Sequence, residues 1–117
     1  MSARIDLGRF GEDTAARGLA AQGWRILDRN WRCRLGEIDI VAQDGGDLVV
    51  VEVKTRRGTA FGAPEEAVTQ AKLARLRRLA AAWLGAQDRR FDGVRVDVVA
   101  VRVGVDGVRV EHLRGVG

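Results

Sequence analysis

The middle of the chain holds two short segments in which apolar residues alternate with charged ones, residues 36–42 and residues 48–54. A polar stretch centred on Gly45-Gly46 separates them. Alternation over this length is typical of β-strands, and a glycine pair between two such segments indicates a tight turn. The pattern therefore predicts a two-stranded antiparallel hairpin.

With the glycine pair in the turn, Asp39 lies opposite Glu52, and Glu37 lies opposite Lys54. Residues two apart share a face of a strand, so all four side chains are expected on one side of the hairpin. Directly opposed Cβ atoms lie roughly 5 Å apart. Two carboxylates at that separation repel each other unless a cation lies between them, and a hard divalent ion such as Mg²⁺ is a common solution.

The other face of the hairpin is expected to be buried and to consist of Ile38, Ile40, Val49, Val51 and Val53. The charged face also has apolar members, namely Val41, Leu48 and Val50. Charges on a partly covered face are costly unless they are paired or bound to metal, which favours a functional site. The alternative is a surface network of ion pairs.

The remaining pattern predicts two helices and three further strands. The expected elements are a helix from about Asp6 to Gln22 ended by Gly23, a strand over 24–32, a helix from Pro64 to about Leu84, and strands over 91–103 and 108–113. Proline and two acidic residues at 64–66 are typical of a helix start. The order helix, three strands, helix, two strands predicts one α/β domain spanning 1–117, with helices packed on a mixed sheet.

Glu12 is the one carboxylate in a helical stripe of small and apolar residues. Two interpretations are open for it. It can pair with Arg9 or Arg17 on its own helix, or it can point across the sheet toward Asp39 and Glu52.

Composition narrows the class of protein. The chain has 117 residues and a net charge of +4, and its pI of about 10.5 favours a polyanionic partner such as nucleic acid. Cys33 is the only cysteine, which excludes an internal disulfide and a multi-cysteine zinc site. No apolar run is long enough to cross a bilayer and no signal segment opens the chain, so no membrane partner and a cytoplasmic location are expected.

Several other side chains have an expected place. His112 is the only histidine, so nucleophilic Ser or Cys catalysis lacks a convincing base, and a structural or solvent-facing role is expected for it. Nucleic-acid contacts are expected from Arg56 and Arg57, in a polar loop after the hairpin, and from Gln70 and Lys72, near the start of the second helix.

Ordered motifs over nearly the whole chain resemble the YraN-like family of small bacterial proteins. They are Gly11-Glu12, Gly23-Trp24-Arg25-Ile26-Leu27, Arg29-Asn30-Trp31, Gly36-Glu37-Ile38-Asp39-Ile40-Val41-Ala42, Val51-Glu52-Val53-Lys54-Thr55-Arg56 and Arg95-Val96-Asp97. That family is assigned to the restriction-endonuclease-like fold, PD-(D/E)XK, and resembles archaeal Holliday-junction resolvases. Its members are described as candidate endonucleases.

The resemblance implies a site for Mg²⁺ (or Mn²⁺) with Asp39 and Glu52 as ligands. It also implies that Lys54 is the catalytic lysine that positions the attacking water and that Glu12 is a supporting acid. Ile38 stands where the name of the fold has proline. A homodimer and a branched DNA substrate follow by analogy with the resolvases.

The sequence therefore predicts a metal-dependent endonuclease acting on nucleic acid, with DNA as the expected substrate. Two alternatives remain: a nucleic-acid-binding module of the same fold without efficient cleavage, and a structural or interaction protein. The family's late motif has two candidates, Arg90-Phe91-Asp92 and Arg95-Val96-Asp97, of which the second precedes the expected apolar strand. Its role is open.

Overall fold

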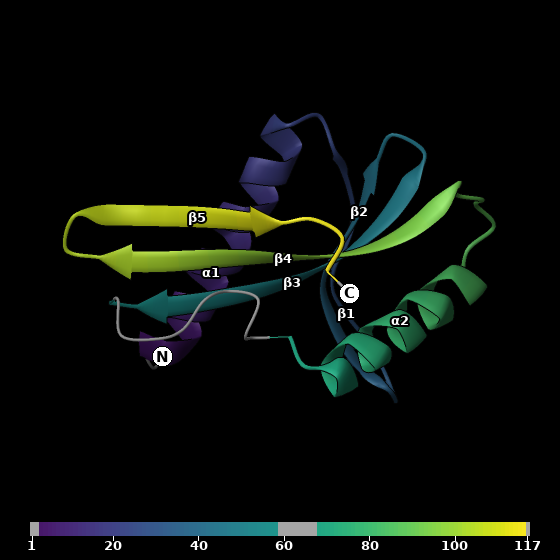
Figure 1. Ribbon diagram of the computed structural model, residues 1–117, viewed down its shortest axis with the longest axis horizontal. Helices are drawn as coiled ribbons and strands as arrows, with labels where there is room; N and C mark the ends of the chain where they lie inside the picture. Colours follow the sequence, from purple (N-terminus) through teal and green to yellow (C-terminus); the bar gives the residue numbers. More distant parts are fainter. Residues whose placement is uncertain (1–2, 59–67, 117) are drawn as a thin grey trace.

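The computed structural model of the protein describes residues 3–58 and 68–116. Its elements in chain order are α1 (Ala3–Ala21), β1 (Arg25–Cys33), β2 (Gly36–Asp44), β3 (Asp47–Arg57), α2 (Gln70–Gly85), β4 (Gly93–Gly104) and β5 (Gly107–Leu113). The strands form one five-stranded sheet in the order β1-β2-β3-β4-β5, and α1 and α2 lie on its opposite faces (Figure 1). This is the mixed α/β architecture of a restriction-endonuclease-like core.

The sheet is mixed because only one pair of neighbouring strands is parallel. Strands β1, β2 and β3 follow one another antiparallel, β3 and β4 are parallel, and β4 and β5 form an antiparallel hairpin. A parallel pair needs a long connection, and α2 lies within the one that joins β3 to β4. Of the helices in the described ranges, none has the length and apolar character needed to cross a lipid bilayer.

Two apolar clusters pack on the two faces of the sheet, which is why β3 and β4 contain long apolar runs. The α1 side holds Ala15, Ala16, Leu19, Trp24, Ile40, Ala42, Val49, Val51, Val99 and Val101. The α2 side holds Ile38, Val41, Leu48, Val50, Leu73, Leu76, Leu79, Ala80, Trp83 and Val96.

The predicted hairpin register is confirmed near the turn. Asp44 pairs with Asp47, Gly45 has φ +60°, and pairing continues outward as far as Ile40 and Val51. The backbone pairing between β2 and β3 ends there, so Asp39 does not continue the ladder to the opposite strand. Its carboxylate instead accepts a hydrogen bond from the backbone N–H of β3, and the strands separate beyond this point.

One predicted face assignment is wrong. Ile38 was expected beside Ile40, but Ile38 packs on the α2 side and Ile40 on the α1 side. Asp39 lies between them. On the neighbouring strand β1, Asn30 lies between the partners of Ile40 and Ile38. Its φ of +52° is the one positive φ among the non-glycine residues of the described ranges. Asparagine tolerates this left-handed conformation, and the strict alternation of faces is lost here.

Helix α1 approaches β3 very closely at Gly11. A Cβ atom built on Gly11 would lie 2.8 Å from the Cβ of Thr55 and closer still to its hydroxyl oxygen. Only glycine therefore allows this approach. The next residue in the helix, Glu12, is thereby brought next to the sheet.

Several predicted boundaries are corrected. Strand β3 runs to Arg57, so Arg56 and Arg57 belong to a strand, not to a loop. Helix α2 begins at Gln70 with Thr69 as N-cap, whose side chain accepts the N–H of Lys72; threonine is a strong capping residue. The expected start at 64–66 lies outside the described residues. Helix α1 begins three residues earlier than expected, and the ends of β1, β4 and β5 differ from prediction by one or two residues.

Candidate metal centre and active site

The candidate site lies where β2 and β3 separate. A pocket of about 330 Å³ opens at this fork, under the first turns of α2. Charged side chains dominate its lining: Glu37, Asp39, Glu52, Lys54, Lys72 and Arg75. Helix α1 reaches the same fork from the other face of the sheet, so groups from both layers meet there.

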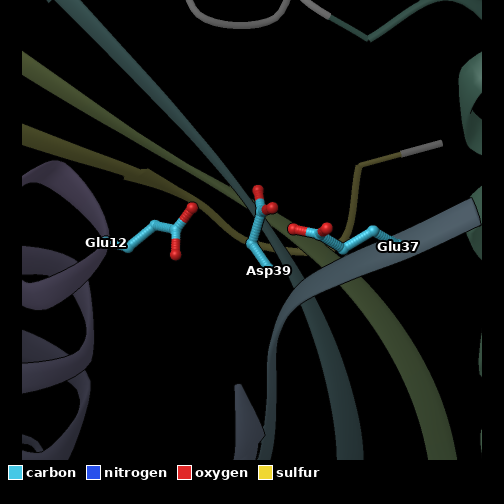
Figure 2. A group of neighbouring side chains, drawn as sticks. All are labelled: Glu12, Glu37 and Asp39. Carbon is cyan, nitrogen blue, oxygen red and sulfur yellow. The ribbon is translucent and has the colours of Figure 1, made fainter. Parts of the chain in front are cut away.

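Three carboxylates converge at this point. Glu12, Glu37 and Asp39 each offer one oxygen, and these oxygens all lie within 4.8 Å of one another. Figure 2 shows that Glu12 extends from α1 toward Asp39, while Glu37 reaches it from the opposite side along β2. Of the two interpretations of Glu12, the structure therefore supports the one in which it points across the sheet.

Asn30 holds two of these carboxylates together. Its amide nitrogen Nδ2 donates to Oε1 of Glu12 at 2.7 Å and to Oε1 of Glu37 at 3.4 Å. The other oxygen of Glu37 accepts from Nε of Arg32 at 2.6 Å. Sequence reasoning missed Asn30. The available signal was an asparagine inside a predicted strand, where this residue is unfavourable.

Asp39 is the most strongly perturbed carboxyl group of the site. Burial raises its pKa from 3.8 to about 7; the hydrogen bond from the backbone of Val53 opposes this, and the nearby charges of Glu52 and Glu12 add to the rise. The side chain of Glu52 also lies close enough to that of Asp39 to raise its pKa further. An acid this close to other acids keeps its proton to a higher pH than an isolated acid does, unless a cation compensates the charge.

Glu52 is buried, with 6% of its surface exposed, and it contacts two lysines. Oε2 of Glu52 lies 2.6 Å from Nζ of Lys72 and 3.5 Å from Nζ of Lys54. Lys54 therefore lies where the sequence placed it, beside Glu52. Lys72 was expected only as an outer phosphate contact, but it is part of the centre.

The structure groups the acids differently from the predicted pair. The sequence implied Asp39 and Glu52 as the ligands, whereas the three oxygens that lie closest together belong to Glu12, Glu37 and Asp39. Asp39 is common to both sets. The register argument placed Glu37 near the site through Lys54, and it did not anticipate that Glu37 turns toward Asp39.

The remaining predicted contacts lie outside this pocket. Arg56 and Arg57 are exposed at the far end of β3. Gln70 is exposed and lines a different pocket, of about 460 Å³, between the start of α2 and the end of the chain. Arg75 lines the site pocket and was not predicted. Its signal was its position three residues after Lys72, on the same side of the helix.

Both candidates for the late motif lie elsewhere. Asp97 is fully buried, accepts from Nε of Arg95 at 2.9 Å and lies 2.8 Å from Nε2 of His112. The backbone N–H of Asp92 donates to the carbonyl of Gly46 in the hairpin turn. Neither acid lines the site pocket, so both have structural surroundings, and the structural role expected of His112 is supported.

The donor set fits a hard divalent cation. Four carboxyl groups gather at one fork, and oxygen ligands of this kind suit Mg²⁺ and Mn²⁺. Burial raises the pKa of Asp39 most, and the charges of Glu52 and Glu12 add to the rise through repulsion. A bound cation would relieve that repulsion.

Comparison with known proteins agrees with the resemblance found in the sequence. Residues 11–101 match the model of Uncharacterised protein family UPF0102. The chain is 58% identical to a UPF0102 protein of Beutenbergia cavernae, with all of both chains aligned. It is 60% identical to one of Frankia alni, covering 98% of this chain and 97% of the relative, and 60% identical to one of an Arthrobacter species, covering both chains fully. The chain therefore belongs to the UPF0102 family, for which the YraN-like designation fits.

Proposed function

We propose that this protein is a metal-dependent endonuclease that hydrolyses phosphodiester bonds of nucleic acid, with DNA as the expected substrate. One observation supports this most: three carboxyl groups and two lysines line one pocket at the fork between β2 and β3, and the carboxyl group of Glu12 reaches two of these acids from α1. Acids that only decorate a surface do not need to be gathered where burial and mutual repulsion raise a pKa to about 7.

In this proposal Asp39 and Glu52 are the principal ligands of Mg²⁺ or Mn²⁺, and Glu12 and Glu37 complete the acidic set. A bound metal ion polarises the phosphodiester and lowers the pKa of a bound water. Asn30 positions two of the acids through its amide. Its left-handed backbone, φ +52°, is the kind of local strain that occurs at functional sites.

The lysines supply positive charge on the side of the pocket nearest α2. Lys54 follows Glu52 by two residues on β3 and lies within 3.5 Å of its carboxylate. From there its ammonium group can orient an attacking water or stabilise the negative charge that develops on the phosphate. Arg75, which lines the same pocket, is available for a neighbouring phosphate oxygen.

A second candidate function has its own observation. Lys72 lies 2.6 Å from Glu52 and already neutralises a proposed ligand. A protein that binds nucleic acid without cutting it would keep this ion pair and would not need the metal. In the nuclease, the ammonium group of Lys72 must give up at least part of its contact when the cation binds.

The test is cleavage of branched, single-stranded and duplex DNA with Mg²⁺, with Mn²⁺ and with EDTA. Glu52→Ala and Lys54→Ala should abolish metal-dependent cutting and leave DNA binding largely intact, while Asp88→Ala, in an exposed loop after α2, serves as the control. Cutting that survives Glu52→Ala would refute the nuclease assignment. Salt-sensitive binding with no cutting by the wild type would favour the binding module, and neither activity would favour an interaction protein.

A further inference from the structure

Three arginines lie in a row across three neighbouring strands. Arg56 on β3 is the register partner of Arg102 on β4, and Arg102 is in turn the partner of Arg109 on β5. Register partners share a face of the sheet. We call Arg56, Arg102 and Arg109 the arginine row.

Such a row is unfavourable in the protein alone, because like charges directly opposite each other on a sheet repel. One acid compensates it in part: Oε1 of Glu111 lies 3.8 Å from Nε of Arg102. Arg56 and Arg109 are exposed, and Arg56 donates from Nη1 to the carbonyl of Thr55 at 2.8 Å. The exposed guanidinium groups of Arg56 and Arg109 thus stand on either side of Arg102, on a surface suited to an anion.

The surface beside the row is hollowed. A pocket of about 680 Å³ is lined by Arg102, Arg109 and Glu111 together with Gly58 and the β4–β5 turn, in which Asp106 is a second acid. Figure 1 shows that this end of β3, β4 and β5 lies away from α2. The hollow therefore has room for a ligand at the arginines.

The row continues the face on which the candidate centre lies. Lys54 precedes Arg56 by two residues and Glu52 precedes it by four on the same strand, so their side chains share a face. Four residues of strand span about 13 Å. A chain of phosphates bound at the row would therefore lead directly to the pocket at the fork.

We propose that the arginine row is a binding site for the phosphodiester backbone of nucleic acid, adjacent to the candidate centre. This inference rests on the proposed function for its ligand, and it adds Arg102 and Arg109, which had no expected role. Guanidinium groups bind phosphate oxygens in a two-pronged geometry and hold the backbone without reading base sequence. The row would position the strand that enters the centre.

The experiment measures binding and cutting separately. Fluorescence anisotropy with single-stranded and duplex DNA, in EDTA at several salt concentrations, compares the wild type with the double variant Arg102→Gln/Arg109→Gln. The matched control is Arg89→Gln/Arg90→Gln, which removes the same charge from exposed positions before the start of β4. Thermal unfolding of each variant is recorded alongside.

Each lost phosphate contact should lower the slope of log K against log salt by about one. The double variant is therefore expected to lose affinity for both DNAs, with a slope smaller by about two and a melting temperature no lower than that of the wild type. The control variant should keep the wild-type slope. A double variant that binds DNA like the control variant would refute the proposal that the arginine row binds the phosphodiester backbone. A wild type that does not bind DNA at low salt would refute it as well. If the slope falls as expected but no substrate is cut, the row stands and the nuclease fails.

Discussion

The carboxylate of Asp39 accepts the backbone N–H of Val53 at 2.8 Å, at the place where β2 and β3 cease to pair. The side chain of Asp39 thus accepts the backbone N–H that a main-chain carbonyl of β2 would accept if the two strands continued to pair. The strands remain linked through this bond, yet their backbones separate far enough for a pocket to form. The same bond holds a carboxyl group where burial raises its pKa to about 7.

The first prediction concerns Asp39→Asn. The folded-state pKa lies above the unfolded value of 3.8, so between about pH 4 and pH 7 the folded protein retains a proton that the unfolded chain releases, and stability in the absence of metal falls as pH rises. Asparagine keeps an acceptor for the N–H of Val53 without the charge. Asp39→Asn should therefore be more stable than the wild type at pH 8, by roughly 1–3 kcal/mol.

Urea unfolding in EDTA at pH 4.5 and at pH 8 tests this difference. At pH 4.5 the wild-type carboxyl group is protonated and the two proteins should have similar free energies of unfolding. A variant that is less stable than the wild type at both pH values would show that Asp39 has an ordinary structural role. Asp88→Asn, on an exposed loop, is the control for a simple change of net charge.

The second prediction is that divalent metal raises the melting temperature, and does so more strongly at pH 8 than at pH 6. The ligand carboxyl groups must be deprotonated to bind a cation, so binding competes with the proton held by Asp39. A ligand that binds only the folded state stabilises it in proportion to the logarithm of its concentration. Thermal unfolding with Mg²⁺ or Mn²⁺ should shift the wild type and should not shift Asp39→Asn. An equal shift in both proteins would place the metal elsewhere.

The third prediction concerns the ion pair between Lys72 and the buried Glu52. Removing one partner of a buried pair leaves an uncompensated charge, and because Lys54 remains nearby we expect Lys72→Ala to cost about 1–3 kcal/mol. Mg²⁺ should restore part of this loss by replacing the missing positive charge. Chemical unfolding with and without metal measures both effects, with Arg78→Ala on an exposed position of α2 as control. A loss that metal does not reduce would argue against Glu52 as a ligand.

The parts of this site that depend on local sequence alternation could be predicted, and the parts that depend on tertiary packing could not. The hairpin register depends on local alternation and a glycine pair, so the placement of Asp39 and Glu52 on adjacent strands was accessible. The convergence of Glu12 and Glu37 on Asp39 was not, because it depends on the bend at Asn30 and on how closely α1 approaches the sheet. Both are tertiary features that override the period-two pattern.

The same reasoning explains the elements that were misjudged. The second helix was expected to include residues 68 and 69, whereas α2 begins at Gln70 with Thr69 as its N-cap; several residues could serve as a start, and the apolar pattern alone does not select one. The polar end of β3 was expected to be a loop, because no apolar residues alternate with Arg56 and Arg57 in the sequence. Their strand structure comes from pairing with β4.

The fourth prediction tests the close approach of α1 through Gly11→Ala. The new methyl group would collide with the side chain of Thr55, whose Cβ would lie 2.8 Å away. Overpacking of this kind typically costs 1–3 kcal/mol, against a gain of about 1 kcal/mol in helix propensity. We expect a net loss of stability and, because Glu12 moves with the helix, weaker metal binding. Adding Thr55→Ala should restore part of both, whereas Gly18→Ala, which meets open space, should stabilise the protein.

The fifth prediction separates the two acids of the late motif. Asp97 is fully buried and accepts from Arg95, from the backbone N–H of Gly115 and, at 2.8 Å, contacts His112. Asp97→Ala would remove the shared acceptor of these groups, of which Arg95 keeps a second one in Asp44, and should cost about 3–5 kcal/mol. Asp92→Ala should cost much less, since the bond from its backbone N–H to the hairpin turn does not need the side chain. Chemical unfolding gives the two costs. The metal affinity of the folded protein should be unchanged in both variants. If Asp97→Ala lowers the metal affinity under conditions in which the variant is fully folded, Asp97 belongs to the candidate metal centre.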